Sequence, residues 1–89
     1  NKRHDVPTTK VVVQVDKDMA RYMEWDRHYF GFQKETVTDN YVEMHFECIN
    51  MENGFARWYL MFADKGTIIE PESLKEVVKR LLSSAWEQI

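Results

Sequence analysis

The sequence predicts an α+β fold, with a four-stranded antiparallel sheet backed by two helices and a further helix appended at the C-terminal end. Three observations predict it: a β-branched run at 11–15, strict alternation of polar and apolar residues at 41–48, and an apolar stripe at helical spacing over 74–89. The 89 residues can form one core but not two, and 44% hydrophobic with 30% charged residues is typical of a folded domain.

Residues 1–9 are polar, contain Pro7 and have no periodicity, so we expect a linker tail there. We expect residues 10–89 to form a single domain. Because the chain begins with Asn1 rather than Met, we also expect it to be a fragment of a larger protein.

The first strand is predicted at 10–15, where β-branched side chains predominate. Asp16 can then cap a helix that ends near Asp26. Three apolar side chains of this helix share one face and are expected in the core: Met19, Tyr22 and Met23.

The second and third strands are predicted at 29–37 and 41–49, joined by the three-residue loop 38–40. In such a loop the last residue, Asn40, is expected in the left-handed region, which asparagine tolerates. This loop places Phe30 and Phe32 on the same face as Phe46. A two-residue loop would instead place Phe32 opposite Glu47, and a one-residue slip reverses every side chain, so face matching favours the longer loop.

The third strand has two chemically distinct faces. Its apolar face is formed by Val42, Met44, Phe46 and Cys48, and its polar face by Glu43, His45 and Glu47. Together with Gln33 and Glu35 on the neighbouring strand, the polar residues Glu43, His45 and Glu47 form a candidate ligand or partner face. The alternative reading is a merely solvated face.

The second helix is predicted to start at Asn53 and to bury an aromatic stripe: Phe55, Trp58, Tyr59 and Phe62. A turn at 64–66, a short strand at 67–70 and a long helix from Pro71 follow. The resulting β-α-β-β-α-β order, with a helix appended, is the ferredoxin-like arrangement.

The segment Phe55–Phe62, followed by a turn and by Ile68–Leu74, resembles the C-terminal extension (WCX) domain of WYL-domain-containing bacterial transcriptional regulators. That family has a Trp-bearing helix, a turn, a short strand and a Pro-Glu-x-Leu helix start. The upstream elements also resemble the family. The run 11–15 and the following Met-Ala-x-Tyr are similar to its opening strand and helix, and Gln33 lies where the family often has a glutamine in the second strand. Ala63 departs from it, because a glycine commonly follows the helix Phe. The letters Trp-Tyr-Leu at 58–60 are a coincidence, since the tripeptide that names the WYL domain lies in a different, upstream domain.

The resemblance implies a parent regulator with a helix-turn-helix and a WYL domain upstream, acting as a homodimer. It also implies that this piece contributes to dimer contacts and to transmitting the ligand state. DNA would then be bound only by the separate helix-turn-helix domain.

Charge and composition exclude several other functions. The net charge is −3 and no predicted face is basic, which argues against nucleic-acid binding by this piece. The same fold order can bind RNA through exposed aromatic side chains, but here that sheet face carries carboxylates. With one cysteine, no signal peptide and no membrane-spanning run, we expect a cytoplasmic protein without membrane association.

We expect no enzyme activity, no cofactor and no metal. Cys48 is the only thiol and lies on an apolar face. His45 and Cys48 have opposite parity on one strand, so they cannot share a metal with each other. An alternative function is an ACT-like small-molecule-sensing domain, although such sensors usually have a glycine between the first strand and helix, and residues 15–18 contain none.

The end of the last helix is a candidate interface. Its stripe outruns what a small sheet can cover, which leaves Leu82, Trp86 and Ile89 available for contact with a second molecule. The alternative is that Trp86 completes the core of the monomer.

Overall fold

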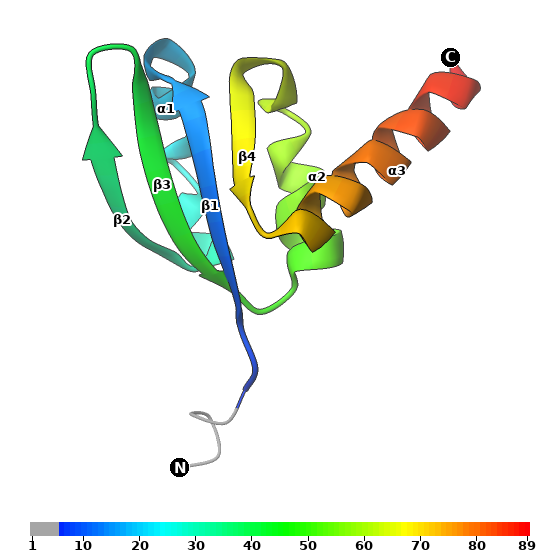
Figure 1. The fold of residues 1–89 in the computed structure, drawn as a ribbon, viewed down its shortest axis with the longest axis horizontal. Coiled ribbons are helices and arrows are strands. Elements are labelled where there is room, and N and C mark those ends of the chain that lie inside the picture. Colours follow the sequence, from blue (N-terminus) through cyan, green and yellow to red (C-terminus); the bar gives the residue numbers. More distant parts are fainter. Residues whose placement is uncertain (1–5) are drawn as a thin grey trace.

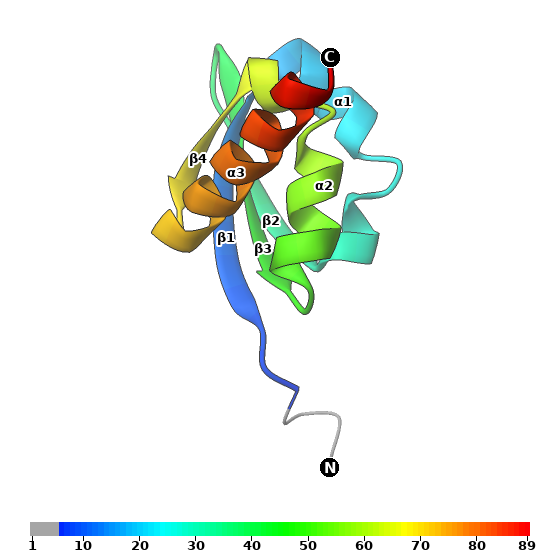
Figure 2. The ribbon, with the colours of Figure 1, turned by 90° about the vertical axis from the view of Figure 1, so that its right-hand side faces the viewer.

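The computed structural model of the chain describes residues 6–89. The strands are β1 (Thr9–Asp16), β2 (Phe32–Val37), β3 (Tyr41–Cys48) and β4 (Gly66–Glu70), and the helices are α1 (Lys17–Met23), α2 (Ala56–Tyr59) and α3 (Glu72–Gln88). The sheet order is β2-β3-β1-β4 with every neighbouring pair antiparallel. Figures 1 and 2 show α1 and α2 on one side of this sheet and α3 leaving from the β4 edge. The predicted α+β sheet fold is therefore confirmed, with three short helical turns added to the simple ferredoxin-like order: η2 (Arg27–Phe30), η3 (Met51–Phe55) and η4 (Ala63–Lys65).

The predicted linker, residues 1–9, ends before Thr9, because Thr9 is the first residue of β1. Residues 1–5 of that linker lie outside the described part of the chain. Thr9 already belongs to β1, and the Thr8 hydroxyl donates a hydrogen bond to the Glu47 carboxylate at 2.8 Å. The chain is thus tied to the sheet one residue before the first strand begins.

The expectation that Tyr22 is a core residue is wrong. Helix α1 buries Ala20 and Met23, whereas the Tyr22 side chain is 61% exposed. Successive helical residues are separated by about 100° around the helix. Ala20 and Met23 define the buried face of α1, and Tyr22 points away from that face toward solvent. The helix also ends at Met23, before Asp26, and Asp16 occupies the N-cap position without a side-chain capping bond.

The second strand begins at Phe32 rather than at Tyr29. Residues Arg27–Phe30 form the turn η2, which ends at Gly31 in the left-handed conformation with φ +84°. The Gly31 carbonyl accepts a 2.8 Å hydrogen bond from the Glu47 amide, and a Cβ at Gly31 would overlap the Glu47 carbonyl oxygen. The close approach of β3 therefore requires glycine here, and its conformation interrupts the extended chain.

The hairpin register was predicted correctly at Phe32, but the predicted loop is wrong. Val37 pairs with Val42 and the Thr38 amide donates to the Tyr41 carbonyl at 2.9 Å, so the turn contains two residues, and Asn40 does not have a positive φ. This turn alone would place Phe32 opposite a polar residue. A β-bulge between Phe32 and Lys34 shifts the register back and pairs Phe32 with Phe46.

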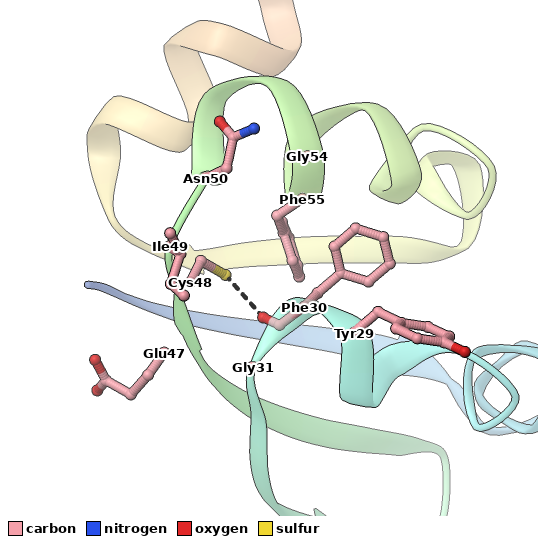
Figure 3. A pocket seen from close by; sticks show the side chains of 9 residues that line it. All are labelled: Tyr29, Phe30, Gly31, Glu47, Cys48, Ile49, Asn50, Gly54 and Phe55. Carbon is pink, nitrogen blue, oxygen red and sulfur yellow. Dashed lines mark hydrogen bonds between the residues drawn. The ribbon is translucent and has the colours of Figure 1, made fainter. Parts of the chain in front are cut away.

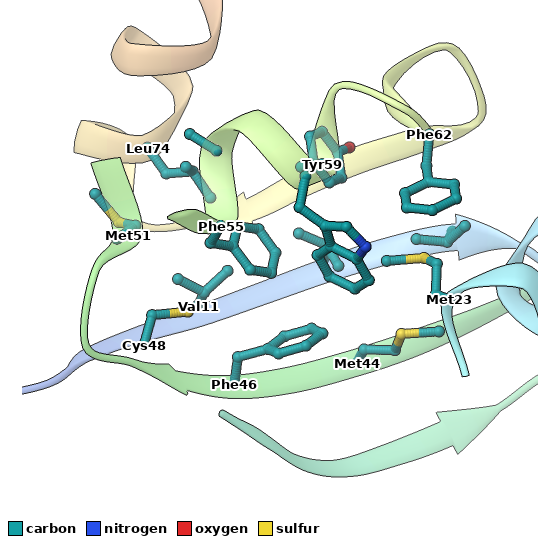
Figure 4. Close-up of a cluster of buried hydrophobic side chains, with 14 of the residues drawn as sticks. Val11, Met23, Met44, Phe46, Cys48, Met51, Phe55, Tyr59, Phe62 and Leu74 are labelled. Atoms are coloured by element: carbon teal, nitrogen blue, oxygen red, sulfur yellow. The ribbon is translucent and has the colours of Figure 1, made fainter. Parts of the chain in front are cut away.

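The core lies between the sheet and the helices. Alternate residues of β1 and β3 point into it, as strand parity predicted for β3, and Figure 4 shows several of them beneath Phe55 and Tyr59. The Phe46 ring centroid lies 4.9 Å from that of Phe55 and 6.0 Å from that of Trp58, both in edge-to-face geometry. The predicted aromatic stripe is buried over its full length: Phe55, Trp58, Tyr59 and Phe62.

The start of the second helical segment was misassigned. Asn50, not Asn53, is the N-cap, and its side chain accepts a hydrogen bond from the Asn53 amide at 3.4 Å. The segment opens with the π-helical turn Met51–Phe55, which adds a buried residue, Met51, ahead of the aromatic stripe.

Helix α3 is buried at its N-terminal half only. Leu74, Val77 and Val78 pack into the core, whereas Leu81 is half-buried and the residues beyond it are exposed. Figure 1 shows the helix running away from β4 toward its C-terminal end. No helix within residues 6–89 is long and apolar enough to cross a membrane.

Candidate interaction surfaces

The sheet face opposite the helices gathers four of the five predicted polar residues, Gln33, Glu43, His45 and Glu47. Gln33, His45 and Glu47 line one shallow hollow together with Lys10 and Lys34. Gln33 reaches it because the β-bulge spaces Gln33 and Lys34 differently from a regular strand. The Gln33 side chain donates to the Gly31 carbonyl at 3.2 Å.

Two carboxylates on this open face have partners within the domain. Glu43 lies 2.8 Å from the ring nitrogen Nε2 of His45, and Glu47 accepts the Thr8 hydroxyl. Both carboxylates are therefore already engaged within the domain. At the centre, Val12 pairs with His45 and Glu70 and is only 3% exposed although it faces away from the helices. The face is thus a polar surface over a covered apolar centre.

The expectation that Glu35 lies on this face is wrong, because the two-residue turn places it opposite a core residue of β3. It pairs with Met44 on the helix side and forms a 2.7 Å ion pair with Arg27. The Arg27 guanidinium also stands 3.8 Å from the Phe32 ring centroid, a cation–π contact. These contacts cover the helix-side flank of the edge strand β2.

The end of α3 forms a second surface. Leu82 is 47% exposed, Trp86 78% and Ile89 98%. Trp86 therefore does not complete the core of the single copy. Exposed apolar side chains of this size on one helix end are typical of a contact surface.

A groove that the sequence did not predict lies between α3 and β4. It has a volume of about 330 Å³, and its apolar lining residues are Tyr59, Ala63, Gly66, Ile68, Val78 and Leu82. Gly66 was predicted only as a turn residue. In the structure, a Cβ at Gly66 would come within 2.6 Å of the Tyr59 hydroxyl oxygen, so the absence of a side chain at Gly66 leaves room for that hydroxyl at the groove floor.

A smaller pocket of about 250 Å³ lies between η2 and the end of β3. Figure 3 shows the rings of Phe30 and Phe55 beside it, with Glu47 and Asn50 pointing away. Ligand sites combine an apolar lining with a few convergent polar groups, and the Asn50 side chain is already used as a helix cap. This pocket therefore does not favour the small-molecule-sensor alternative.

Cys48 has the environment of a structural thiol. It is 2% exposed, and its Sγ lies 3.3 Å from the Phe30 carbonyl oxygen, to which it donates. Burial, with a smaller contribution from the Glu47 charge, raises the pKa of the Cys48 thiol to about 12. The nucleophilic thiolate is therefore scarce at neutral pH.

Residues 6–89 contain no cluster of three or more His, Cys, Asp and Glu side chains that could hold a metal ion. His45 lies on the open face and Cys48 in the core, as their parity predicted. His28 is beside Tyr29, with ring centroids 4.1 Å apart.

The fold and these surfaces define a small α+β domain of the ferredoxin-like class, with a polar open sheet face and a projecting apolar helix end. The WCX domain family matches residues 7–86, so the chain belongs to that family, as the Trp-helix and Pro-Glu-x-Leu segments predicted. Comparisons with curated proteins and with solved structures found no match.

Proposed function

We propose that this domain is the C-terminal regulatory and dimerisation domain of a helix-turn-helix, WYL-containing bacterial transcriptional regulator. The observation that carries the proposal is membership of the WCX family across residues 7–86. The domain would act by binding rather than by catalysis, with the upstream WYL domain and a second subunit as partners. DNA would be bound only through the separate helix-turn-helix domain.

Two features of the surface support this role. The exposed end of α3, with Leu82, Trp86 and Ile89, offers apolar contact area for a second copy. The open face, whose carboxylates are engaged with His45 and Thr8, offers a polar surface for the upstream domain.

The dimerisation part is tested by sedimentation equilibrium of the 89-residue chain and of two variants. We expect wild type to self-associate at about 100 µM, a weak but measurable affinity, and Trp86→Ala to sediment as a monomer. Trp25→Ala is the matched control, because Trp25 is exposed to a similar extent, 83% against 78%, but lies just beyond α1. A wild-type chain that is monomeric at this concentration would contradict dimerisation by this domain.

The regulatory part is tested by the gene that encodes the chain. We expect a WYL domain and a helix-turn-helix encoded upstream of Asn1. A metabolic enzyme fused there would instead favour a sensing domain and would contradict the proposal.

A further inference from the structure

Asn53 and Gly54 form an Asn-Gly pair on the π-helical turn η3. The other two glycines follow Phe30 and Lys65, so this is the only such pair in the chain. Asparagine is one of the chemically labile residues of proteins. It is most reactive before glycine, because glycine has no Cβ to hinder attack by its own amide nitrogen. The Asn53 side chain is exposed, so water and hydroxide reach it.

Deamidation at this pair needs only hydroxide and water. The Gly54 amide gives its proton to hydroxide, and its nitrogen then forms a bond to the side-chain carbonyl carbon of Asn53. The side-chain nitrogen of Asn53 takes up a proton and leaves as ammonia, and a five-membered succinimide ring remains. Water opens this ring at one of its two carbonyls. The product is aspartate, or isoaspartate when the main chain comes to run through the former side chain.

In the folded chain, the attacking nitrogen is engaged elsewhere. The Gly54 N–H donates to the Asn50 carbonyl at 2.9 Å, and the same carbonyl accepts the Phe55 N–H at 3.1 Å. The Asn50 side chain also accepts the Asn53 N–H at 3.4 Å, and Figure 3 shows Asn50 and Gly54 on this turn. Amide protons bonded in this way are released to solvent only when the structure opens. Asn50 therefore protects the Asn-Gly pair through its hydrogen bonds.

The turn can open without unfolding of the sheet. The buried residues Met51 and Phe55 anchor its two ends, whereas the residues between them are exposed or half-buried. π-Helical turns are rare, and the capping bond from Asn53 to Asn50 is long for an N–H···O hydrogen bond. Segments with exposed hydrogen bonds and few buried side chains open at a lower free energy than the whole domain.

We propose that Asn53 is a site of spontaneous deamidation, and that local opening of the turn capped by Asn50 sets its rate. Isoaspartate adds one atom to the main chain between Met51 and Phe55, which are both buried. The turn can then no longer hold both side chains in the core and keep its hydrogen bonds to Asn50. The reaction gives the folded domain a finite chemical lifetime, and the inference is independent of the proposed function.

Mass spectrometry of the tryptic peptide 35–57 tests the site. The 89-residue chain is kept at mildly alkaline pH, either folded or in guanidinium chloride, and the aspartate and isoaspartate products are separated by chromatography. We expect deamidation at Asn53 in both samples, at a rate about tenfold or more lower in the folded chain, because only the opened turn reacts. Asn40 and Asn50 precede larger residues in the same peptide and serve as slow internal references. An intact Asn53 in the denatured chain would overturn the site, and equal rates would overturn its protection by the turn.

Variants at the cap test whether opening is controlled by Asn50. Asn50→Ala removes the capping side chain and should raise the rate in the folded chain by about fivefold, the factor that corresponds to a typical N-cap. Asn50→Asp keeps a capping oxygen and should deamidate at the wild-type rate. The role of the cap is overturned if Asn50→Ala reacts no faster than wild type, or if Asn50→Asp reacts as fast as Asn50→Ala.

Gly54→Ala tests the chemistry of the step. A Cβ at this position would lie 3.6 Å from the nearest atom, which is an ordinary contact, so the fold accommodates it. The added methyl group hinders attack by the amide nitrogen, so the rate at Asn53 should fall several-fold even in the denatured chain. An unchanged rate would show that the product does not arise through a succinimide at this pair.

Val15→Ala is the control for global unfolding. Val15 is fully buried near the end of β1, whereas Thr9, at the start of that strand, lines a hollow together with Asn53. Truncating a buried side chain lowers the stability of the whole domain without changing the turn. We expect the deamidation rate of folded Val15→Ala to equal that of wild type. An acceleration as large as that of Asn50→Ala would show that Asn53 reacts only after global unfolding, and the inference of a locally gated site would fail.

Discussion

Replacing Phe46 with alanine should remove the central support of the core. The side chain is fully buried, and its ring packs edge-to-face on three others: Phe32 at 5.7 Å, Phe55 at 4.9 Å and Trp58 at 6.0 Å between centroids. Truncating a buried Phe to Ala costs about 3–5 kcal/mol. Because aromatic pairs contribute about 0.5–1.5 kcal/mol beyond area, we expect the upper half of that range.

The expected loss is large compared with the stability of the domain. At about 0.05–0.15 kcal/mol per residue, a chain of 89 residues has a free energy of unfolding of about 4–13 kcal/mol. Phe46→Ala should therefore lower the urea midpoint by about 1.3–5 M, given a slope of about 1–3 kcal/mol per M. Phe46→Leu, which leaves a smaller cavity, should give an intermediate midpoint and remains measurable if the alanine variant does not fold.

Glu43→Ala is the matched control on the same strand. The Glu43 carboxylate pairs with His45 at 2.8 Å on the half-exposed face, and such pairs contribute about 1 kcal/mol or less. Both variants are measured by circular dichroism during urea unfolding. Equal losses for Phe46→Ala and Glu43→Ala would show that the two faces of β3 have been assigned wrongly.

Three further predictions concern turns, caps and charge. Gly31→Ala should destabilise the fold by more than about 1 kcal/mol, because its positive φ and the adjacent β3 carbonyl exclude a Cβ, whereas Gly54→Ala should be tolerated, since the nearest atom there is 3.6 Å away; thermal melts of both variants provide the comparison. Asn50→Ala should cost about 1 kcal/mol, the usual value of a lost N-cap, and more than Asn53→Ala in the same melts; the reverse order would restore the assignment of Asn53 as the cap. The domain alone should not bind duplex DNA in a low-salt gel shift, because its net charge is −3 and phosphate binding needs a basic surface; sub-micromolar binding would refute this.

Periodicity in the sequence was sufficient to assign the faces of β3 and of the helical stripe at 55–62. Parity in β3 separates Phe46 from His45, and both lie on the predicted faces. The same reasoning placed Glu43, His45 and Glu47 together on the open face, since they alternate along β3. It failed at Tyr22, because a seven-residue helix is too short for its apolar pattern to define the buried direction.

Local sequence could not specify where regular structure is interrupted. The choice between Asn50 and Asn53 as the cap depended on a π-helical turn that no spacing indicated. The start of β2 depended on Gly31, whose conformation is required by the approach of the Glu47 backbone from the neighbouring strand. The start of β2 is therefore decided by a contact with a segment sixteen residues away in the chain.

The sequence by itself determined the α+β class, the family and which side chains are apolar enough to form the core, because these depend on residue type and on periodicity along the chain. Only the tertiary structure decided that a bulge restores the pairing of Phe32 with Phe46, and that α3 leaves the core after Val78 so that Trp86 is exposed. The physical reason is the same in both cases, because strand register and the burial of a helix depend on where a second element lies. A one-residue shift of a strand, or a change in the direction of a helix, changes the long-range contacts without changing the conformational preference of any residue.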